Sequence, residues 1–281
     1  MFYVIEQTNK CNLRCKMCPN RFNQRPKGYM TPEMFKDIID QQIRHNGKFK
    51  DERVAMHGLG EPLLSPYLFD NLDYLQARGF NNVDFSDNGM LFTEEIARKL
   101  CKYTIFNFIK ISFNSSRKEI MEEINTGSDY ETVLKNIRMF ADIIKETGAN
   151  FKFLVQLMHT SKSMDETPEE MKRVIDRDNV TVLECRINDF GAVGKSDLNI
   201  DGYNFWDGNC VFADTSMQFH WDGDMVGCCA DDTKGQVYGN AKDGIYSEKV
   251  EAKKNQFRRE LCENKYDNLP TCKKCEGKNK L

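Results

Sequence analysis

Short runs of β-branched and aromatic residues alternate with longer stretches of helical periodicity from the start of the chain to about residue 187. In one helical stretch the apolar residues Val133, Leu134, Ile137, Phe140, Ala141 and Ile144 fall on one face. Six strands are predicted, at residues 2–5, 53–57, 82–86, 106–113, 151–158 and 180–187. Five helices are predicted between them, at residues 31–45, 67–77, 93–102, 130–147 and 167–177.

The order of these elements predicts an α/β fold. Repeated strand and helix units form parallel sheets with right-handed crossovers, and six units make either an open doubly wound sheet or a partial barrel. Two helix starts are marked, because Thr31-Pro32 and Thr167-Pro168 each supply an N-cap residue followed by proline. In both architectures ligands bind at the carboxyl ends of the strands, so functional residues are expected directly after them.

The pattern changes after about residue 194. Residues 215–220 and 225–228 flank Trp221-Asp222-Gly223-Asp224, which predicts a hairpin, and a charged helix is expected near residues 247–261. This tail holds six of the eleven cysteines but little apolar material, so a metal cross-link would stabilise it. We predict a boundary near residue 200, with a core domain at 1–200, a small cysteine-rich domain at 201–281 and a frayed end at 276–281.

Composition and charge narrow the function classes. The 281 residues are 40% hydrophobic and 30% charged, which is typical of a folded chain. The formal net charge is only -3 and no long basic block appears, so neither nucleic acid nor an anionic membrane is an expected partner. No apolar run approaches the roughly 18 residues of a membrane span, and no export signal is visible, so a cytoplasmic location is expected.

The cysteines favour metal binding over disulfides. Their number is odd, the chain is long and no export signal is seen. Cys11, Cys15 and Cys18 form a C-x3-C-x2-C run soon after the first predicted strand. Three thiolates at this spacing can bind one face of an iron–sulfur cluster and leave one iron without a protein ligand, whereas structural zinc usually takes four protein ligands.

This triplet, together with Gly58-Leu59-Gly60-Glu61-Pro62 after the second strand, resembles the radical S-adenosylmethionine (radical SAM) superfamily. The resemblance implies a partial (β/α)6 TIM-like barrel with a [4Fe–4S] cluster on the three cysteines and S-adenosylmethionine (SAM) on the open iron. It also implies that backbone carbonyls of Leu59, Gly60 and Glu61 hold the methionine amino group of SAM. Glycine permits that close approach.

The same resemblance assigns further SAM-binding residues. Met17, which precedes the third cysteine, is implied to pack near adenine, although an aromatic residue is commoner there. Residues at or near the ends of the third, fourth and fifth strands are implied to hold the ribose and methionine groups, namely Asn88, Ser112, Asn114 and Gln156. The alternative for serine and asparagine at strand ends is an ordinary turn-forming role.

A second group of cysteines lies in the tail. Cys210, Cys228, Cys272 and Cys275 supply the four thiolates of a complete auxiliary [4Fe–4S] cluster, and the 17 residues between the first two suffice for a hairpin. With the segment Val-Tyr-Gly-Asn at 237–240, this arrangement resembles the shortened SPASM or twitch extension of radical SAM enzymes and the 2-deoxy-scyllo-inosamine dehydrogenase family. A zinc ribbon is the alternative, since four cysteines suit zinc equally well.

Four cysteines remain outside these groups. Cys101 and Cys185 are expected to be buried, although Cys185 could face the barrel interior. Cys262 is either a free thiol or an alternate ligand. Cys229 adjoins Cys228, so it could exchange with that ligand, donate a hydrogen atom or only pack. Three other polar residues are given ordinary roles, with His57 as a strand-end structural group and Arg186 and Asp189 as solvated charges rather than substrate-binding groups.

The resemblance implies reductive cleavage of SAM to a 5′-deoxyadenosyl radical that abstracts hydrogen from an unactivated C–H bond. The expected substrate is a small polar molecule, such as a sugar or aminocyclitol, and the expected reaction is a two-electron oxidation. The alternatives are epimerisation with Cys229 as hydrogen donor and modification of a peptide. An external electron donor such as flavodoxin or ferredoxin is implied. A non-catalytic iron–sulfur electron carrier and a zinc-stabilised binding protein remain the non-enzymatic alternatives.

Overall fold

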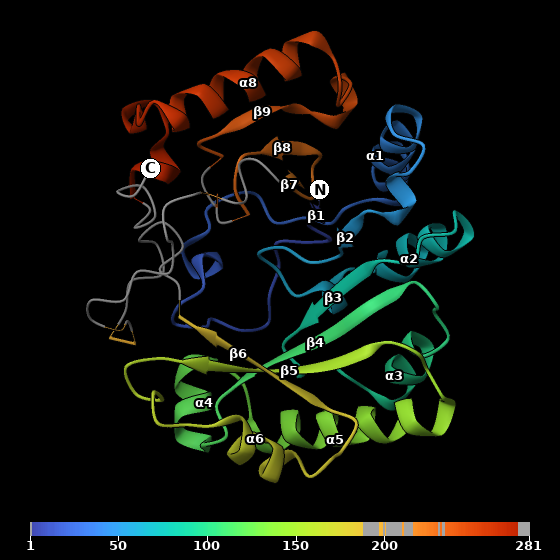
Figure 1. The fold of residues 1–281 in the computed structure, drawn as a ribbon, viewed down its shortest axis with the longest axis vertical. Helices are drawn as coiled ribbons and strands as arrows, with labels where there is room; N and C mark the ends of the chain where they lie inside the picture. Colours follow the sequence, from blue (N-terminus) through green and yellow to red (C-terminus); the bar gives the residue numbers. More distant parts are fainter. Residues whose placement is uncertain are drawn as a thin grey trace.

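A computed structural model describes residues 2–187, 197, 198, 200, 210, 216–229, 231 and 234–274. Within these residues the strands form one nine-stranded sheet in the order β6-β5-β4-β3-β2-β1-β7-β8-β9 (Figure 1). The strands are β1 (Phe2–Ile5), β2 (Arg53–Ala55), β3 (Val83–Asp87), β4 (Phe106–Asn114), β5 (Lys152–His159), β6 (Thr181–Arg186), β7 (Ser216–Phe219), β8 (Asp224–Val226) and β9 (Val237–Asn240). Predictions for Asp189, Cys275 and residues 276–281 lie outside the described residues.

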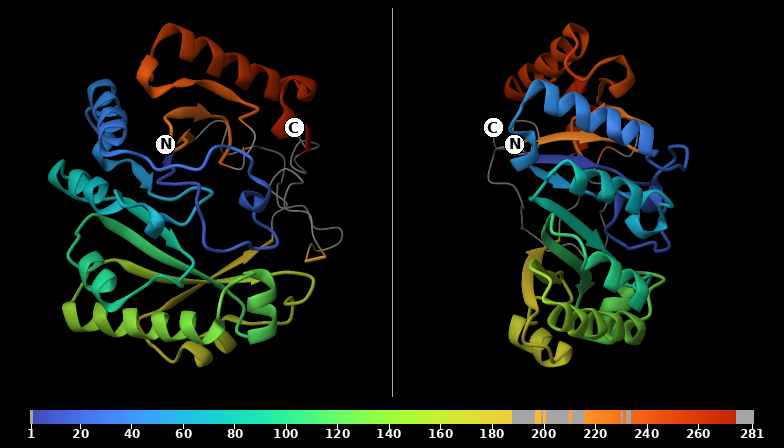
Figure 2. Two further views of the ribbon diagram at one scale, coloured as in Figure 1. Left: turned by 180° about the vertical axis from the view of Figure 1, so that it is seen from behind. Right: turned by 90° about the vertical axis from the view of Figure 1, so that its right-hand side faces the viewer.

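The helices cover the outer side of the curved sheet (Figures 1 and 2). They are α1 (Pro32–His45), α2 (Leu68–Ala77), α3 (Glu94–Leu100), α4 (Lys118–Ile124), α5 (Tyr130–Thr147), α6 (Pro168–Ile175), α8 (Glu248–Cys262) and α9 (Pro270–Lys274). Short 3-10 helices are η1 (Pro19–Phe22), η2 (Phe49–Asp51), η3 (Pro62–Leu64), η4 (Ala241–Asp243) and η5 (Tyr266–Asn268). Both predicted proline starts are confirmed, since Thr31 and Thr167 cap α1 and α6 through their side chains.

The six predicted strands and five predicted helices of the first 187 residues are all present, with ends that differ by one or two residues. The strands β1 to β6 run parallel, as expected of strand and helix units. The α/β partial-barrel class is therefore confirmed. The short helix α4 was not predicted, because its seven residues hold only three apolar positions, Ile120, Met121 and Ile124, and these are too few to establish a helical period.

The two faces of the sheet differ in character. On β4 the outward side chains of Ile109, Ile111 and Phe113 are fully buried in the main core beneath the helices. The alternate inward positions Lys110 and Ser112 are polar and retain some exposure. Because successive side chains of a strand point to opposite faces, the barrel interior carries polar side chains that solvent reaches in part.

The tail continues the barrel sheet. Strand β7 pairs in parallel with β1, from Phe2 opposite Ser216 to Ile5 opposite Phe219, and the predicted hairpin is confirmed as the antiparallel pair β7–β8. Strand β9 was not predicted; it pairs with β8, and α8 lies along it (Figure 1). Tail residues Met217 and Phe257 join the same core cluster as the barrel. The boundary near residue 200 stays a prediction.

No helix in the described residues is both long enough and apolar enough to cross a membrane.

Candidate metal and cofactor site

The loop that carries Cys11, Cys15 and Cys18 leaves the carboxyl end of β1 and docks on the end of α4. The backbone N–H of Arg14 donates to the carbonyl of Thr126 at 2.9 Å, and that of Lys16 donates to Ile124 at 3.0 Å. Within the loop the N–H of Cys18 donates to the carbonyl of Cys15 at 3.1 Å. Helix α4, which the sequence pattern did not predict, and Thr126 just after it thus supply the carbonyl groups that hold the cysteine loop.

The three cysteines are half-buried in one loop. Burial raises the pKa of Cys18 to about 11, and burial followed by the charges of Cys18 and Cys11 raises the pKa of Cys15 further. Burial also raises the pKa of Cys11. Among the described residues no three histidine, cysteine, aspartate or glutamate side chains converge on a position for one metal ion. Three cysteine thiols in one loop are the donor chemistry that an iron–sulfur cluster takes, and its iron would favour their deprotonation on binding.

The glycine-rich turn after β2 packs directly on the strand end that leads into the cysteine loop. A Cβ atom on Gly60 would lie 2.1 Å from the carbonyl oxygen of Thr8 and 2.6 Å from that of Lys10. The N–H of Glu61 donates to the carbonyl of Lys10 at 2.7 Å. Only glycine fits this contact, so the turn presents bare backbone beside the cysteines.

The Glu61 side chain forms hydrogen bonds within the protein. Its buried carboxylate accepts from the backbone N–H groups of Leu63 at 3.1 Å and Asn88 at 3.0 Å. Burial and the neighbouring Asp87 raise the pKa of Glu61 well above its ordinary range, and burial raises the pKa of Asp87. The two carboxyl groups therefore share a proton, and Glu61 has only its backbone to offer a ligand.

The polar residues predicted after β3, β4 and β5 are hydrogen-bonded in two groups. Asn88 donates through Nδ2 to Oδ1 of Asn12 at 2.8 Å, next to Cys11. Gln156 donates through Nε2 to Oδ1 of Asn114, and Asn114 donates through Nδ2 to Oδ1 of Asn125, both at 2.7 Å.

Two further bonds extend the second group. Asn125 donates to the carbonyl of Ser112 at 2.8 Å, and Lys110 donates through Nζ to Oε1 of Gln156 at 2.7 Å. Asn114 has a φ of 74°, a left-handed conformation that asparagine tolerates. The structure thus connects Ser112, Asn114 and Gln156, while Asn88 lies by the cysteine loop.

Met17 belongs to a small apolar cluster at the carboxyl edge of the barrel. Its members are Met17, Ile124, Met158, Ile187 and Leu198, with Cys185 packed against them. The thiol of Cys185 also lies 3.6 Å from the carbonyl oxygen of Leu157. All five members are buried, and the two methionine side chains can adapt to the shape of a neighbouring group.

A buried ion pair that sequence reasoning missed joins three segments at the site. Glu6 and Arg25 form two hydrogen bonds, of 2.9 and 3.1 Å, with both side chains only 3% exposed. Glu6 also accepts from the N–H of Leu59 in the glycine turn and of Trp221 in the tail, both at 3.3 Å. No local pattern identifies this pairing, because its partners are distant in sequence.

The inward face of the barrel carries a cluster of charged and polar side chains below the site, which includes His57, Lys110 and Arg53. Burial, with the charges of Lys110 and Arg53, lowers the pKa of His57 to about 3, so its ring is neutral. Burial lowers the pKa of Lys110 as well. His57 Nδ1 is buried and has no hydrogen-bond partner among the described residues. Arg53 forms an ion pair with Asp84 and lies over the rings of Phe2 and Phe108.

Three of the four predicted auxiliary ligands, Cys210, Cys228 and Cys272, are among the described residues, and all three are half-buried. Cys210 and Cys272 pack against the main core. The amide of Gln236 donates to the thiol of Cys272 at 3.4 Å. The described residues do not bring three metal-binding side chains together, and Cys275 lies outside them, so the auxiliary site stays a prediction.

Asp231 holds the loop between these cysteines. Its buried carboxylate accepts from the N–H groups of Gly235 at 3.0 Å and Gln236 at 2.9 Å and from the hydroxyl of Thr271 at 3.2 Å. The loop is thereby tied to α9, the helix that carries Cys272. The four predicted thiolates would suit a second iron–sulfur cluster, and the same donor set suits zinc.

The remaining cysteines are distributed differently. Cys101 packs against the main core, which confirms its predicted burial. Cys185 is half-buried, Cys229 is half-buried beside Cys228, and Cys262 is exposed at the end of α8.

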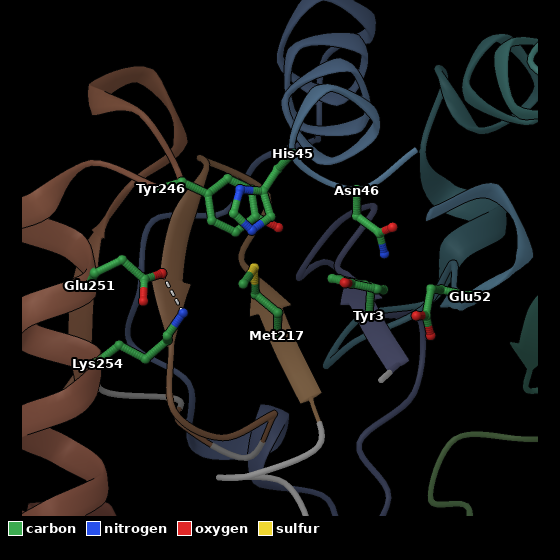
Figure 3. A pocket seen from close by; sticks show the side chains of 8 residues that line it. All are labelled: Tyr3, His45, Asn46, Glu52, Met217, Tyr246, Glu251 and Lys254. Carbon is green, nitrogen blue, oxygen red and sulfur yellow. Dashed lines mark hydrogen bonds and ion pairs between the residues drawn. The ribbon is translucent and has the colours of Figure 1, made fainter. Parts of the chain in front are cut away.

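A cavity of about 560 Å³ lies at the opposite edge of the sheet (Figure 3). Tyr3 and Met217, near the starts of β1 and β7, line it, and the rings of His45 and Tyr246 stack at 3.5 Å. The cysteine loop follows the other end of β1. This cavity is therefore separate from the candidate site.

Comparison with known proteins agrees with the geometry. The chain is 22% identical over 256 residues to the tungsten-containing aldehyde ferredoxin oxidoreductase cofactor-modifying protein of Pyrococcus furiosus, covering 81% of this chain and 70% of that protein. Its fold is similar to that of BtrN in complex with AdoMet and 2-DOIA, with a TM-score of 0.63, 18% identity and coverage of 98% and 92%. It is also similar to anSMEcpe with bound AdoMet and Kp18Cys peptide, with a TM-score of 0.68, 17% identity and coverage of 100% and 92%.

The family comparison covers the segment that builds the site. A family model described as the radical SAM superfamily matches residues 5–158, more than half of the chain, and this span includes the cysteine loop, the glycine turn and strands β2 to β4. The chain therefore belongs to the radical SAM superfamily, whose members use a [4Fe–4S] cluster and SAM.

Proposed function

We propose that this protein oxidises a small polar substrate, such as a sugar or aminocyclitol, by removing two hydrogens from it. When bound, the cluster and SAM supply a 5′-deoxyadenosyl radical that abstracts hydrogen from a C–H bond. Cys11, Cys15 and Cys18 would hold this cluster through thiols that already share one buried loop. The protein's own contribution is to bind and orient both reactants.

The SAM site is assigned to the backbone and side chains around the cysteine loop. Carbonyls of Leu59, Gly60 and Glu61 would hold the methionine amino group, because the turn is pressed against Thr8 and Lys10. Met17 and its apolar neighbours would receive the adenine ring. A separate group of polar side chains would serve the ribose and methionine ends of SAM, namely Asn88, Ser112, Asn114 and Gln156.

The proposed class of substrate rests on the polar interior of the barrel. Lys110, Gln156 and His57 project from three strands into this interior, and His57 Nδ1 has no hydrogen-bond partner in the described part of the chain. A buried polar atom without a partner favours a ligand that supplies a hydrogen bond. A polyhydroxylated substrate supplies several hydrogen-bonding groups. The structure of BtrN in complex with AdoMet and 2-DOIA, whose fold is similar, holds a second small molecule together with AdoMet.

The tail thiols support oxidation as the outcome. The tail cysteines Cys210, Cys228, Cys272 and Cys275 would supply a four-thiolate set. An auxiliary cluster there would accept the second electron of the oxidation. Metal analysis of anaerobically purified protein tests this assignment, with about eight iron atoms per chain expected for two clusters. A Cys228→Ala/Cys272→Ala variant should retain about half of that iron, whereas zinc in the wild-type protein would contradict the auxiliary cluster.

Product mass separates the candidate reactions. A loss of two hydrogens from a turned-over aminocyclitol or sugar supports oxidation, whereas an unchanged mass with deuterium from solvent supports epimerisation. Cys229 lies half-buried beside Cys228 and is the candidate hydrogen donor for that second reaction. An epimerisation that survives Cys229→Ala would exclude this thiol as donor. Activity on peptides but not on small molecules would move the substrate class to that of a peptide-modifying enzyme.

Formation of 5′-deoxyadenosine tests the enzymatic assignment itself. The cluster-loaded protein should form it from SAM when reduced with dithionite. If the iron content is intact and none forms, the protein is a non-catalytic iron–sulfur electron carrier. If the metal is zinc, it is a zinc-stabilised binding protein.

A further inference from the structure

The segment around the site cysteines has a charge opposite to that of the whole chain. Between Glu6 and Glu33 there is no acidic residue, but there are six basic ones, at positions 10, 14, 16, 21, 25 and 27. The complete chain carries a formal net charge of -3. These basic residues are spread through the cysteine loop and the residues after it rather than forming a block, so the folded structure decides which of them remain unpaired.

Two of the six charges are neutralised by carboxylates. Arg25 forms the buried pair with Glu6, and Lys16 lies 2.5 Å from Glu123 and 3.3 Å from Asp197. These ion pairs therefore stabilise the fold, and the paired charges add little to the electrostatic potential outside the protein.

Arg14, Arg21 and Lys27 form no ion pair with a carboxylate in the part of the chain that the structure describes. Their side chains bind uncharged acceptors instead. Arg14 donates to the carbonyl of Cys11 at 3.0 Å and Arg21 to that of Lys16 at 2.9 Å. Lys27 donates to the carbonyl of Asn9 at 3.0 Å and to Oδ1 of Asn20 at 3.1 Å.

The same three side chains lie near the site thiols. The carbonyl that Arg14 binds belongs to Cys11 itself. The carbonyls that Arg21 and Lys27 bind lie two residues before Cys18 and Cys11. The unpaired positive charge is thus concentrated over the metal site.

An exposed aromatic side chain lies within this charged region. Phe22 is 50% exposed, and it ends η1, the short helix that begins directly after Cys18. The guanidinium carbon of Arg21 is 4.8 Å from the centre of the Phe22 ring. An aromatic residue beside arginine is the combination that is enriched in protein interfaces and their energetic centres. We call Arg14, Arg21, Phe22 and Lys27 the basic face.

We propose that the basic face docks an acidic protein that carries a one-electron flavin or iron–sulfur centre. This rests on the proposed function, because reductive cleavage of SAM consumes an electron that the chain must receive from outside. In the docked pair the donor loses one electron and the cluster held by Cys11, Cys15 and Cys18 gains it, with no bond formed or broken in the transfer. The positive charge attracts the acidic donor, and Phe22 makes the central apolar contact.

Charge reversal on the basic face tests the proposal. In Arg21→Glu, the binding of a purified bacterial flavodoxin and of a [2Fe–2S] ferredoxin to the cluster-loaded protein is titrated from low to high salt. We expect at least about a tenfold weakening at low salt that shrinks as salt rises, because screening removes the electrostatic part. Phe22→Ala should weaken binding at every salt concentration, since an apolar contact is not screened.

Lys99→Glu is the matched control. Lys99 is also an exposed basic residue over an aromatic ring, 3.8 Å from the centre of Phe69, but it lies on α3 on the outer side of the barrel. Its reversal changes the net charge by the same amount and should leave donor binding unchanged. Equal weakening in both variants would show that only the overall charge matters and would overturn the proposal.

A second readout separates docking from other roles of these charges. With dithionite as reductant, Arg21→Glu should form 5′-deoxyadenosine as fast as the wild-type protein, whereas with the protein donor it should be slower. Loss of iron from Arg21→Glu would show that the charge stabilises the cluster instead. Failure of wild-type protein to bind either acidic donor at low salt also overturns the docking surface. Failure of the dithionite reaction in wild-type protein counts against the proposed function, a distinct result.

Discussion

At the residue scale, Gly60 shows the tightest fit in the site. The atoms that a Cβ would meet are backbone oxygens of Thr8 and Lys10, at 2.1 and 2.6 Å, and backbone cannot swing aside as a side chain can. We predict that Gly60→Ala displaces the glycine turn and weakens SAM binding at least about tenfold, as misplacement of a ligand-holding backbone does. Equilibrium binding of SAM to the cluster-loaded variant measures this effect.

Gly47→Ala is the control for that substitution. Nothing lies within 4 Å of a Cβ at this position, so SAM binding should be unchanged. A Gly60→Ala protein with the wild-type affinity would show that the turn does not approach the cofactor.

The Glu61 and Asp87 carboxyl pair gives a second prediction at this scale, for the dependence of stability on pH. Burial and Asp87 raise the pKa of Glu61, so the folded protein keeps a proton that the unfolded chain releases above about pH 4.3. The free energy of unfolding gained from this proton is present at low pH and is lost as the pH rises through the raised pKa. Thermal unfolding of cluster-free protein from about pH 4.5 to neutrality measures this loss.

Asp87→Asn should reduce that dependence, because it removes the neighbouring negative charge. The asparagine keeps a carbonyl oxygen to accept from the N–H of Gly89, as Oδ1 of Asp87 does at 2.6 Å. The stability of the variant should fall less steeply with pH than that of the wild-type protein. Parallel curves for the two proteins would refute a shared proton.

At the element scale, Glu6 connects the end of β1 to the cysteine loop, the glycine turn and the tail. We predict that Glu6→Gln lowers the free energy of unfolding by about 3 to 5 kcal/mol, because it leaves Arg25 charged and buried without its partner. Urea denaturation followed by circular dichroism measures the change. The iron content should fall as well, since Arg25 lies in the segment that follows the site cysteines.

Asp178→Asn is the comparison for Glu6→Gln. Its pair with Lys145 joins two side chains that are 76% and 64% exposed, and such surface pairs contribute little because solvent screens them. No measurable loss of stability is expected there. Similar losses in the two variants would mean that burial does not decide the strength of these pairs.

Elements differ in how far their own sequence specifies them. Helix α5 was placed correctly because eighteen residues repeat one apolar face, and α1 and α6 because threonine and proline mark their starts. Helix α4 and strand β9 were missed. Each is short and depends on contacts with other elements, with β9 paired to β8 and covered by α8.

At the scale of the whole molecule, the tail completes the barrel. Strand β7 pairs with β1 along its whole length, and Met217 and Phe219 enter the main core. We predict that a chain ending at residue 200 is aggregated or poorly packed, because it exposes the edge of β1 and the core beside it. Size-exclusion chromatography and near-ultraviolet circular dichroism measure this.

A chain that ends after Cys275 provides the control for this truncation. It keeps β7, β8, β9 and all four predicted auxiliary ligands, so its packing should match that of the full chain. A monomeric, well-packed fragment of residues 1–200 would instead establish the predicted boundary as that of an independent domain.

The sequence by itself determined the elements of the barrel and the residue types of the site. Local periodicity, caps and cysteine spacing are properties of neighbouring residues, so β1 to β6 and the C-x3-C-x2-C run can be read without a fold. The resemblance to the radical SAM superfamily also implied that the glycine turn works together with the cysteines, and in the structure both follow adjacent parallel strands.

Only the tertiary structure decided which side chains meet. The Glu6–Arg25 pair and the pairing of the Glu61 and Asp87 carboxyl groups join residues that are far apart in the chain. Likewise, the six basic residues near the cysteines look alike in sequence, and only their contacts distinguish them. Two form ion pairs with carboxylates, Lys10 lies over the ring of Tyr29, and three make up the basic face. Such pairings depend on strand order and burial, which no local pattern of residues encodes.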